Sequence, residues 1–128
     1  MKILIADDEV DFLDYMVDIL DEAFQRPDIT KATNGAQALH LCAESTFDLI
    51  CIDYRMPVMN GLEFTRFLRR EAGPNQYTGI VFISGYLDDF IIEAEALVGV
   101  YFVEKPIQAK HLMRVASLAM QKPLKVKI

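Results

Sequence analysis

The feature that most constrains the fold is an alternation between short apolar segments and longer segments with helical periodicity. Residues 2–6, 28–33, 47–52, 79–84 and 100–104 have the length and composition of buried strands. After each of them, apolar residues recur three to four positions apart, over residues 12–24, 34–42, 61–71, 87–98 and 107–121. This alternation predicts an α/β fold with a doubly wound, five-stranded parallel sheet and right-handed crossovers.

Length and composition predict a single domain. The chain has 128 residues, of which 52% are apolar and 25% charged, an ordinary balance for a globular domain. We expect the domain to span residues 1–121 and residues 122–128 to form a frayed C-terminal tail. In the helix at 61–71 we expect four apolar side chains to face the core, namely Leu62, Phe64, Phe67 and Leu68.

Charge and cysteine content exclude several classes of function. A net charge of -6 disfavours a direct nucleic-acid partner, because such proteins neutralise phosphates with clustered Lys and Arg. Cys42 and Cys51 have apolar surroundings and no nearby metal-ligand motif, so we expect reduced core thiols. The N-terminus is too short for a secretory signal and no apolar run reaches membrane-spanning length. These features predict a soluble, cytoplasmic protein with no membrane partner.

Polar side chains follow four of the five predicted strands. Ligands of open α/β sheets bind beyond the carboxyl ends of the strands. The residues there are Asp7 and Asp8 after the first strand, Asp53 after the third, Ser84 after the fourth and Lys105 after the fifth. Each position has a plain structural interpretation, such as a helix cap or a turn. Their coincidence on one edge of the sheet is what indicates a site.

The acids predict a divalent cation. If the first and third strands are neighbours, as in flavodoxin-like sheets, Asp8 and Asp53 lie within a few ångströms of each other. At roughly 4 Å the two charges repel by about 4 kcal/mol at an effective dielectric near 20. Oxygen ligands without His or Cys favour Mg²⁺ over zinc. With such an ion, a carboxylate can attack a phosphoryl group while the Ser84 hydroxyl and the Lys105 ammonium stabilise its oxygens.

These motifs resemble the receiver domain of two-component response regulators. The resemblance spans about residues 2–121 and is carried by "ADDE", by Asp53 in "DYRMPVMNG", by Ser84-Gly85 and by Lys105-Pro106. It implies a flavodoxin-like sheet with strand order 2-1-3-4-5. It also implies that Asp53 is the phosphoacceptor, taking a phosphoryl group from a phosphohistidine of a sensor histidine kinase or a histidine phosphotransfer protein.

The resemblance implies roles for the surrounding residues as well. Asp8 would bind Mg²⁺ directly, Asp7 through water, and Arg55 through its backbone carbonyl, together with Asp53. Ser84 and Lys105 would contact the phosphoryl group, and Phe102 would be the aromatic switch that follows Ser84. Gly85 would leave the phosphate accessible, and the Lys105-Pro106 peptide would be cis.

The chain departs from the family pattern near the phosphate. Ser replaces the more frequent Thr at position 84, which keeps the hydroxyl donor. Arg55 and Tyr86 flank the phosphate, and we hypothesise that they set the lifetime of the phosphorylated state by controlling the access of water.

The sequence predicts a signalling switch instead of an enzyme, one that assists its own phosphorylation and dephosphorylation. No output domain follows in the sequence, so we expect a stand-alone receiver that binds a downstream protein and is compatible with a monomer or a homodimer. The expected binding face combines the helix at 87–98, the strand at 100–104 and the last helix. Residues in these elements include Phe90, Ile92, Val98, Tyr101 and His111.

Three alternatives stay open. A phosphatase of the haloacid-dehalogenase type would need a second Asp two residues after the nucleophile, where this chain has Arg55. A flavin-binding domain would need a hydroxyl-rich phosphate loop after the first strand, where Asp7, Asp8 and Glu9 would repel a phosphate. A degenerate receiver acting only as a phosphorylation-independent scaffold would keep the fold without the reaction.

Overall fold

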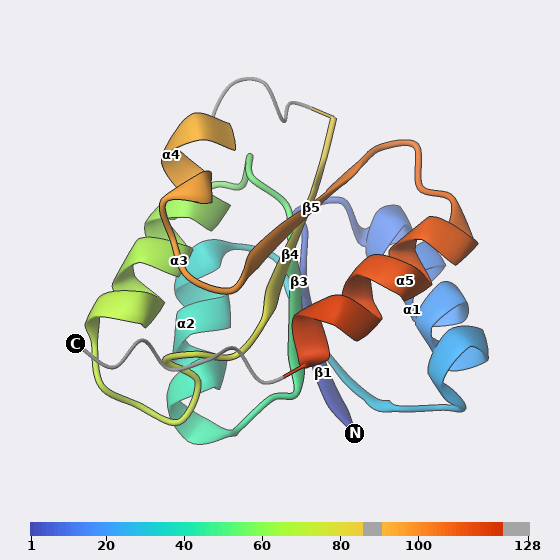
Figure 1. Ribbon diagram of the computed structural model, residues 1–128, viewed down its shortest axis with the longest axis horizontal. Coiled ribbons are helices and arrows are strands. Elements are labelled where there is room, and N and C mark those ends of the chain that lie inside the picture. Colours follow the sequence, from blue (N-terminus) through green and yellow to red (C-terminus); the bar gives the residue numbers. More distant parts are fainter. Residues whose placement is uncertain (86–90, 122–128) are drawn as a thin grey trace.

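In the part of the chain that the structure describes, five parallel strands alternate with five helices (Figure 1). The computed structural model describes residues 1–85 and 91–121. In order, the elements are β1 (Lys2–Ala6), α1 (Val10–Phe24), β2 (Asp28–Ala32), α2 (Gly35–Glu44), β3 (Leu49–Ile52), α3 (Gly61–Arg70), β4 (Ile80–Ser84), α4 (Ile91–Glu95), β5 (Val100–Glu104) and α5 (Ala109–Met120).

The strand order is β2-β1-β3-β4-β5, and all four pairings are parallel. The predicted fold class, a doubly wound flavodoxin-like sheet, is therefore confirmed. The register places Ala6 of β1 opposite Ala32 of β2 and Ile52 of β3. The residues that follow these strands consequently lie together at the carboxyl end of the sheet.

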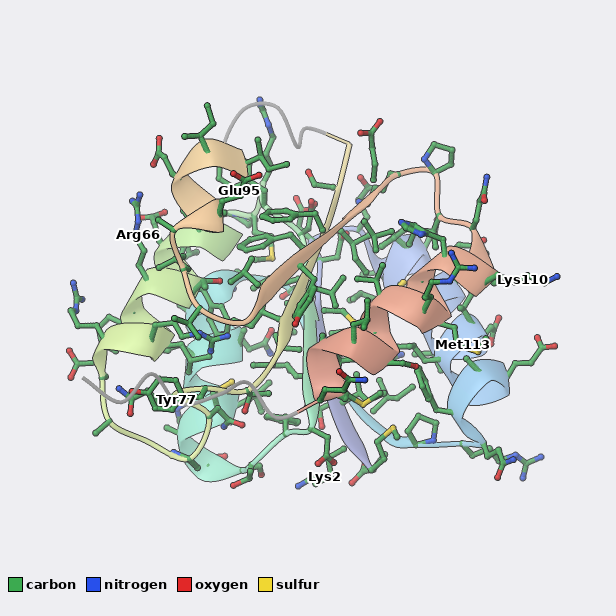
Figure 2. All side chains as sticks on the ribbon, viewed as in Figure 1. Lys2, Arg66, Tyr77, Glu95, Lys110 and Met113 are labelled. Atoms are coloured by element: carbon green, nitrogen blue, oxygen red, sulfur yellow. The ribbon has the colours of Figure 1, made fainter. Side chains whose placement is uncertain are left out.

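Each face of the sheet carries its own hydrophobic core. Helices α2, α3 and α4 cover one face, where Leu4, Ile50 and Phe82 are buried. Helices α1 and α5 cover the other, where Ile5 and Val81 are buried. Side chains fill the space between the ribbons on both sides (Figure 2). Alternate residues of each strand point to opposite faces, which explains why the strands are apolar throughout.

Several boundaries and one side chain differ from the sequence-based expectation, and the largest difference among the described residues is that α4 ends at Glu95 and not at residue 98. Strand β3 begins at Leu49, two residues later than predicted, because the Phe47 amide donates to the Asn75 side chain at 2.7 Å instead of to a strand. Helix α5 begins at Ala109 and not at residue 107. The prediction that Phe67 faces the core is wrong, since its side chain is 38% exposed and the Arg70 guanidinium lies 5.4 Å from its ring centroid.

Other predictions fall on residues outside the described ranges. The start of the helix predicted at 87–98, with Phe90, lies there, as do Tyr86 and the tail at 122–128. The thiols of Cys42 and Cys51 are free and buried, as expected, and burial raises the pKa of each to about 12.

Candidate functional site

The backbone of the sheet places the candidate residues at the carboxyl ends of its strands. Asp7, Asp53 and Lys105 each follow a strand and continue its hydrogen bonding to the neighbouring strand. The Asp7 amide donates to Ala32 O at 3.1 Å, and the Asp53 amide donates to Ala6 O at 3.0 Å. At the other side of the sheet, the Lys105 amide donates to Ser84 O at 3.0 Å. These backbone bonds hold Asp7, Asp53 and Lys105 in place independently of their side-chain contacts.

Lys105 joins the two buried acids. Its Nζ lies 3.0 Å from Asp7 Oδ2 and 3.7 Å from Asp53 Oδ2. The other oxygen of each acid accepts a backbone amide, from Glu9 at 2.9 Å to Asp7 Oδ1 and from Tyr54 at 2.8 Å to Asp53 Oδ1. Asp7 is 2% exposed and Asp53 is 7% exposed, so both carboxylates are held by protein groups with little access to water.

Burial dominates the electrostatics of the site. It raises the pKa of Asp53 to about 6, and the charge of Asp7 adds to this effect, while Lys105, the Tyr54 amide and a hydrogen bond from Ser84 oppose it. Burial also raises the pKa of Asp7. For Lys105, burial lowers the pKa, but the hydrogen bond to Asp7 and the charges of both acids outweigh it, so the pKa is raised overall. The Lys105 ammonium therefore stays charged, but its single positive charge offsets only part of the cost of burying the two carboxylates.

The chemistry of the acids fits a hard divalent cation. One carboxylate oxygen from each of Asp7, Asp8 and Asp53 lies within 4.8 Å of the others. Three carboxylates and one ammonium leave a net charge of -2 when all are ionised. Asp8, unlike the other two acids, is exposed. It lines a cleft of about 890 Å³ together with Tyr54, Arg55, Met56, Pro57 and Asn60. An ion could therefore reach the acids from this side.

The turn after Asp53 is built around Asn60 and Gly61. Asn60 caps α3 in a capping box with Glu63, and the Gly61 amide donates to Tyr54 O at 2.9 Å. A Cβ at Gly61 would meet Asp53 O at 2.3 Å and the Phe82 ring at 2.9 Å, so only glycine allows this close approach. The start of α3 therefore packs directly against the backbone of Asp53.

The remaining predicted residues occupy different surroundings. Ser84 is fully buried next to Asp53, and Gly85 is exposed. Phe102 is half-buried and stacks on Phe82, with ring centroids 6.0 Å apart. Arg55 is exposed at the cleft. The Lys105-Pro106 peptide is cis, as expected.

One residue of the site was missed by sequence reasoning. Phe12, in the first turn of α1, places its ring centroid 4.1 Å from Lys105 Nζ. The apolar spacing identified it only as the start of the periodic segment at residues 12–24. Its position just after "DDE" is the signal that could have placed it at the sheet edge, since the first turn of α1 must lie beside the end of β1.

Comparison with known proteins identifies the family. The response regulator receiver domain matches residues 3–117. This chain belongs to that family. The receiver is 31% identical over 113 residues to the cyclic di-GMP phosphodiesterase response regulator RpfG of Xanthomonas campestris pv. campestris, covering 88% of this chain and 30% of that protein. A response regulator receiver protein of Anaeromyxobacter sp. is also 31% identical over 113 residues, covering 88% of this chain and 45% of that protein.

Solved structures agree on the fold. The receiver domain of a sensor histidine kinase from Pseudomonas aeruginosa PAO1, solved with a magnesium ion coordinated in its active-site cleft, matches with a TM-score of 0.81 and 21% identity. The match covers 93% of this chain and 96% of that one. The receiver described here spans 45% or less of the two curated relatives named above.

The receiver also presents exposed apolar residues away from the acids. Ile92 of α4 is 81% exposed and Val98 is 41% exposed. Tyr101 is half-buried, and His111 on α5 is exposed. Figure 2 shows Lys110 and Met113 on the same helix, away from the core of the sheet. Within residues 1–85 and 91–121, no helix combines the length and apolar character that crossing a membrane requires.

Proposed function

We propose that this receiver accepts a phosphoryl group on Asp53, in a reaction that depends on Mg²⁺. The observation that carries the proposal is a buried carboxylate with a pKa of about 6, held 3.7 Å from the Lys105 ammonium and beside two further acids. Such a carboxylate is ionised near neutral pH and more basic than an ordinary aspartate, which suits a nucleophile.

The donor is proposed to be a phosphohistidine of a sensor histidine kinase or of a histidine phosphotransfer protein. An Asp53 oxygen attacks phosphorus, and the phosphorus–nitrogen bond breaks. The electron pair of that bond stays on the imidazole, which leaves neutral when its other nitrogen carries a proton. Lys105 and the Ser84 hydroxyl, both beside Asp53, orient the phosphoryl oxygens.

Asp7, Asp8, Asp53 and the backbone carbonyl of Arg55 would hold the Mg²⁺. When bound, the ion neutralises charge that the single ammonium leaves uncompensated. Arg55, at the cleft, and Tyr86, outside the described residues, are proposed to set the lifetime of the acyl phosphate by controlling access of water to phosphorus.

The signal is proposed to leave through the face formed by α4, β5 and α5. Movement of the Ser84 hydroxyl toward the phosphoryl group would be followed by Phe102, and this would change how a downstream protein binds the face. Exposed apolar residues support the proposal, notably Ile92 of α4 and Val98 in the turn before β5. We further assign residues 1–121 to the domain, since α5 ends at Met120, and we place the protein in the cytoplasm, in keeping with its free thiols.

Labelling with acetyl phosphate tests the phosphoacceptor. Wild type, Asp53→Ala and the matched control Asp18→Ala, which removes an exposed acid of α1, would be incubated with acetyl phosphate and either Mg²⁺ or EDTA. Intact mass should rise by one phosphoryl group in wild type and in the control with Mg²⁺, and not in Asp53→Ala or with EDTA. A wild type that gains no mass would refute the proposal and favour the scaffold alternative.

A further inference from the structure

The ring of Phe12 contacts the Lys105 ammonium, which also lies close to the two buried acids. Nζ lies 4.1 Å from the ring centroid, compared with 3.0 Å to Asp7 Oδ2 and 3.7 Å to Asp53 Oδ2. The Lys105 side chain is 22% exposed. An ammonium over the face of an aromatic ring is attracted by the negative charge of that face, more strongly where water is excluded.

We propose that Phe12 is a positioning residue for phosphorylation, one that keeps the Lys105 ammonium at the acid pair. The inference rests on the proposed phosphorylation of Asp53. A lysine side chain has a flexible four-carbon stem and a strongly hydrated charge, so it needs contacts to stay ordered. In the described structure, Asp7 accepts its hydrogen bond and Asp53 is farther away. The Phe12 ring adds a third contact, with its centroid 4.1 Å from Nζ.

The ring also suits the change that phosphorylation would impose on Lys105. When Asp53 becomes an acyl phosphate, the charge that attracts the ammonium moves from the carboxylate to the phosphoryl oxygens. The ammonium then has to shift away from its hydrogen bond with Asp7. Attraction to a ring face is spread over the whole ring and has no fixed direction, so the ammonium can move along Phe12 without passing into water.

A purely structural role for Phe12 makes a different prediction. Phe12 is half-buried and packs against the core that α1 covers. Its ring centroid lies 6.2 Å from that of Tyr15. If Phe12 only fills space, an isosteric ring with depleted electron density should work as well as phenylalanine. If the ring attracts Lys105, that replacement should slow the reaction although the shape is kept.

The experiment measures the rate of Asp53 labelling by acetyl phosphate with saturating Mg²⁺, using intact mass. Three changes are compared at position 12: 3,4,5-trifluorophenylalanine, Phe12→Leu and Phe12→Tyr. Tyr15→Leu is the matched control, because Tyr15 is a 48% exposed neighbour on the same helix. We expect the trifluoro variant and Phe12→Leu to be labelled about 3- to 10-fold more slowly. Phe12→Tyr and Tyr15→Leu should stay close to wild type.

The outcomes separate this inference from the proposed function. A labelled wild type with an equally fast trifluoro variant would overturn the role of Phe12 and leave the phosphoacceptor in place. A wild type that gains no phosphoryl group would overturn both. Slow labelling of the trifluoro variant, with the thermal midpoint of wild type, would support a ring that acts through its charge distribution and not through its volume.

Discussion

Replacing Asp53 by Asn should stabilise the metal-free protein at neutral pH. Asp53 is 7% exposed, and burial raises its pKa from 3.8 to about 6. The ionised form is therefore less favourable in the folded protein than in the unfolded chain. Asn keeps the shape of the side chain but carries no charge.

The sign and size follow from proton binding. Between about pH 4 and pH 6 the folded protein binds more protons at Asp53 than the unfolded chain does, so stability falls as pH rises through this window. A pKa difference of about two units between the folded and unfolded states corresponds to about 3 kcal/mol in the free energy of unfolding. Asp53→Asn should thus raise the free energy of unfolding by up to about 3 kcal/mol at pH 7.5, or up to about 10 °C in thermal midpoint. At pH 4.5 the advantage should shrink by about 2 kcal/mol.

Urea unfolding of both proteins at pH 7.5 and pH 4.5, in EDTA, measures this difference. Asp18→Asn, which removes the same charge from an exposed position of α1, is the control and should show no comparable gain. Adding Mg²⁺ at pH 7.5 should stabilise wild type more than Asp53→Asn. An Asn variant no more stable than wild type at pH 7.5, or an advantage that does not narrow at pH 4.5, would show that burial of Asp53 does not have the assigned effect.

Three further changes probe the loops around the sheet. Val58 has φ 70° and is 84% exposed, a backbone conformation that is strained for valine and not for glycine. Val58→Gly should therefore raise the free energy of unfolding by about 1 kcal/mol in urea titrations, and a lower free energy of unfolding would contradict backbone strain at this position. Gly61→Ala would press a methyl group onto Asp53 O and should cost about 2 kcal/mol or more while slowing labelling, whereas Gly73→Ala, with nothing within 4 Å, should do neither. Asn75→Ala removes a buried side chain that bonds one amide, one hydroxyl and two carbonyls, and it should cost about 2–4 kcal/mol with the labelling rate unchanged. Slowed labelling would mean that this distant loop is coupled to the site.

The fold was largely predictable because strand and helix periodicities alternate cleanly along the chain. The strand order came from the family resemblance, since strands that are apolar on both faces do not reveal their neighbours. The start of β3 was misplaced because the sequence does not show that Asn75 binds the Phe47 amide. Phe67 was misplaced because it lies at the margin of the apolar stripe of α3, where Arg70 can cover its ring.

The candidate site was predictable to the extent that parallel strands end at a common edge. That rule brought Asp7, Asp8, Asp53 and Lys105 together without any knowledge of side-chain geometry. It did not distinguish the two adjacent acids, of which Asp7 is buried against Lys105 while Asp8 is exposed. Nor did it show the contact of Phe12 with Lys105, because a helical apolar spacing looks the same whether a ring packs on aliphatic side chains or on an ammonium.

The energetics of the acids connect stability to the proposed switch. The buried Asp53 carboxylate is unfavourable in the metal-free state, because the charge of Asp7 adds to the cost of burial and Lys105 offsets only part of it. Phosphorylation would move negative charge outward onto phosphoryl oxygens that Lys105 and Ser84 can reach. If phosphorylation favours a second conformation, as proposed, relief of this cost and new contacts at the phosphoryl group would both contribute to the change in populations. If Asp53 is the phosphoacceptor, as proposed, the same burial that weakens the fold there would also make this carboxylate a better nucleophile.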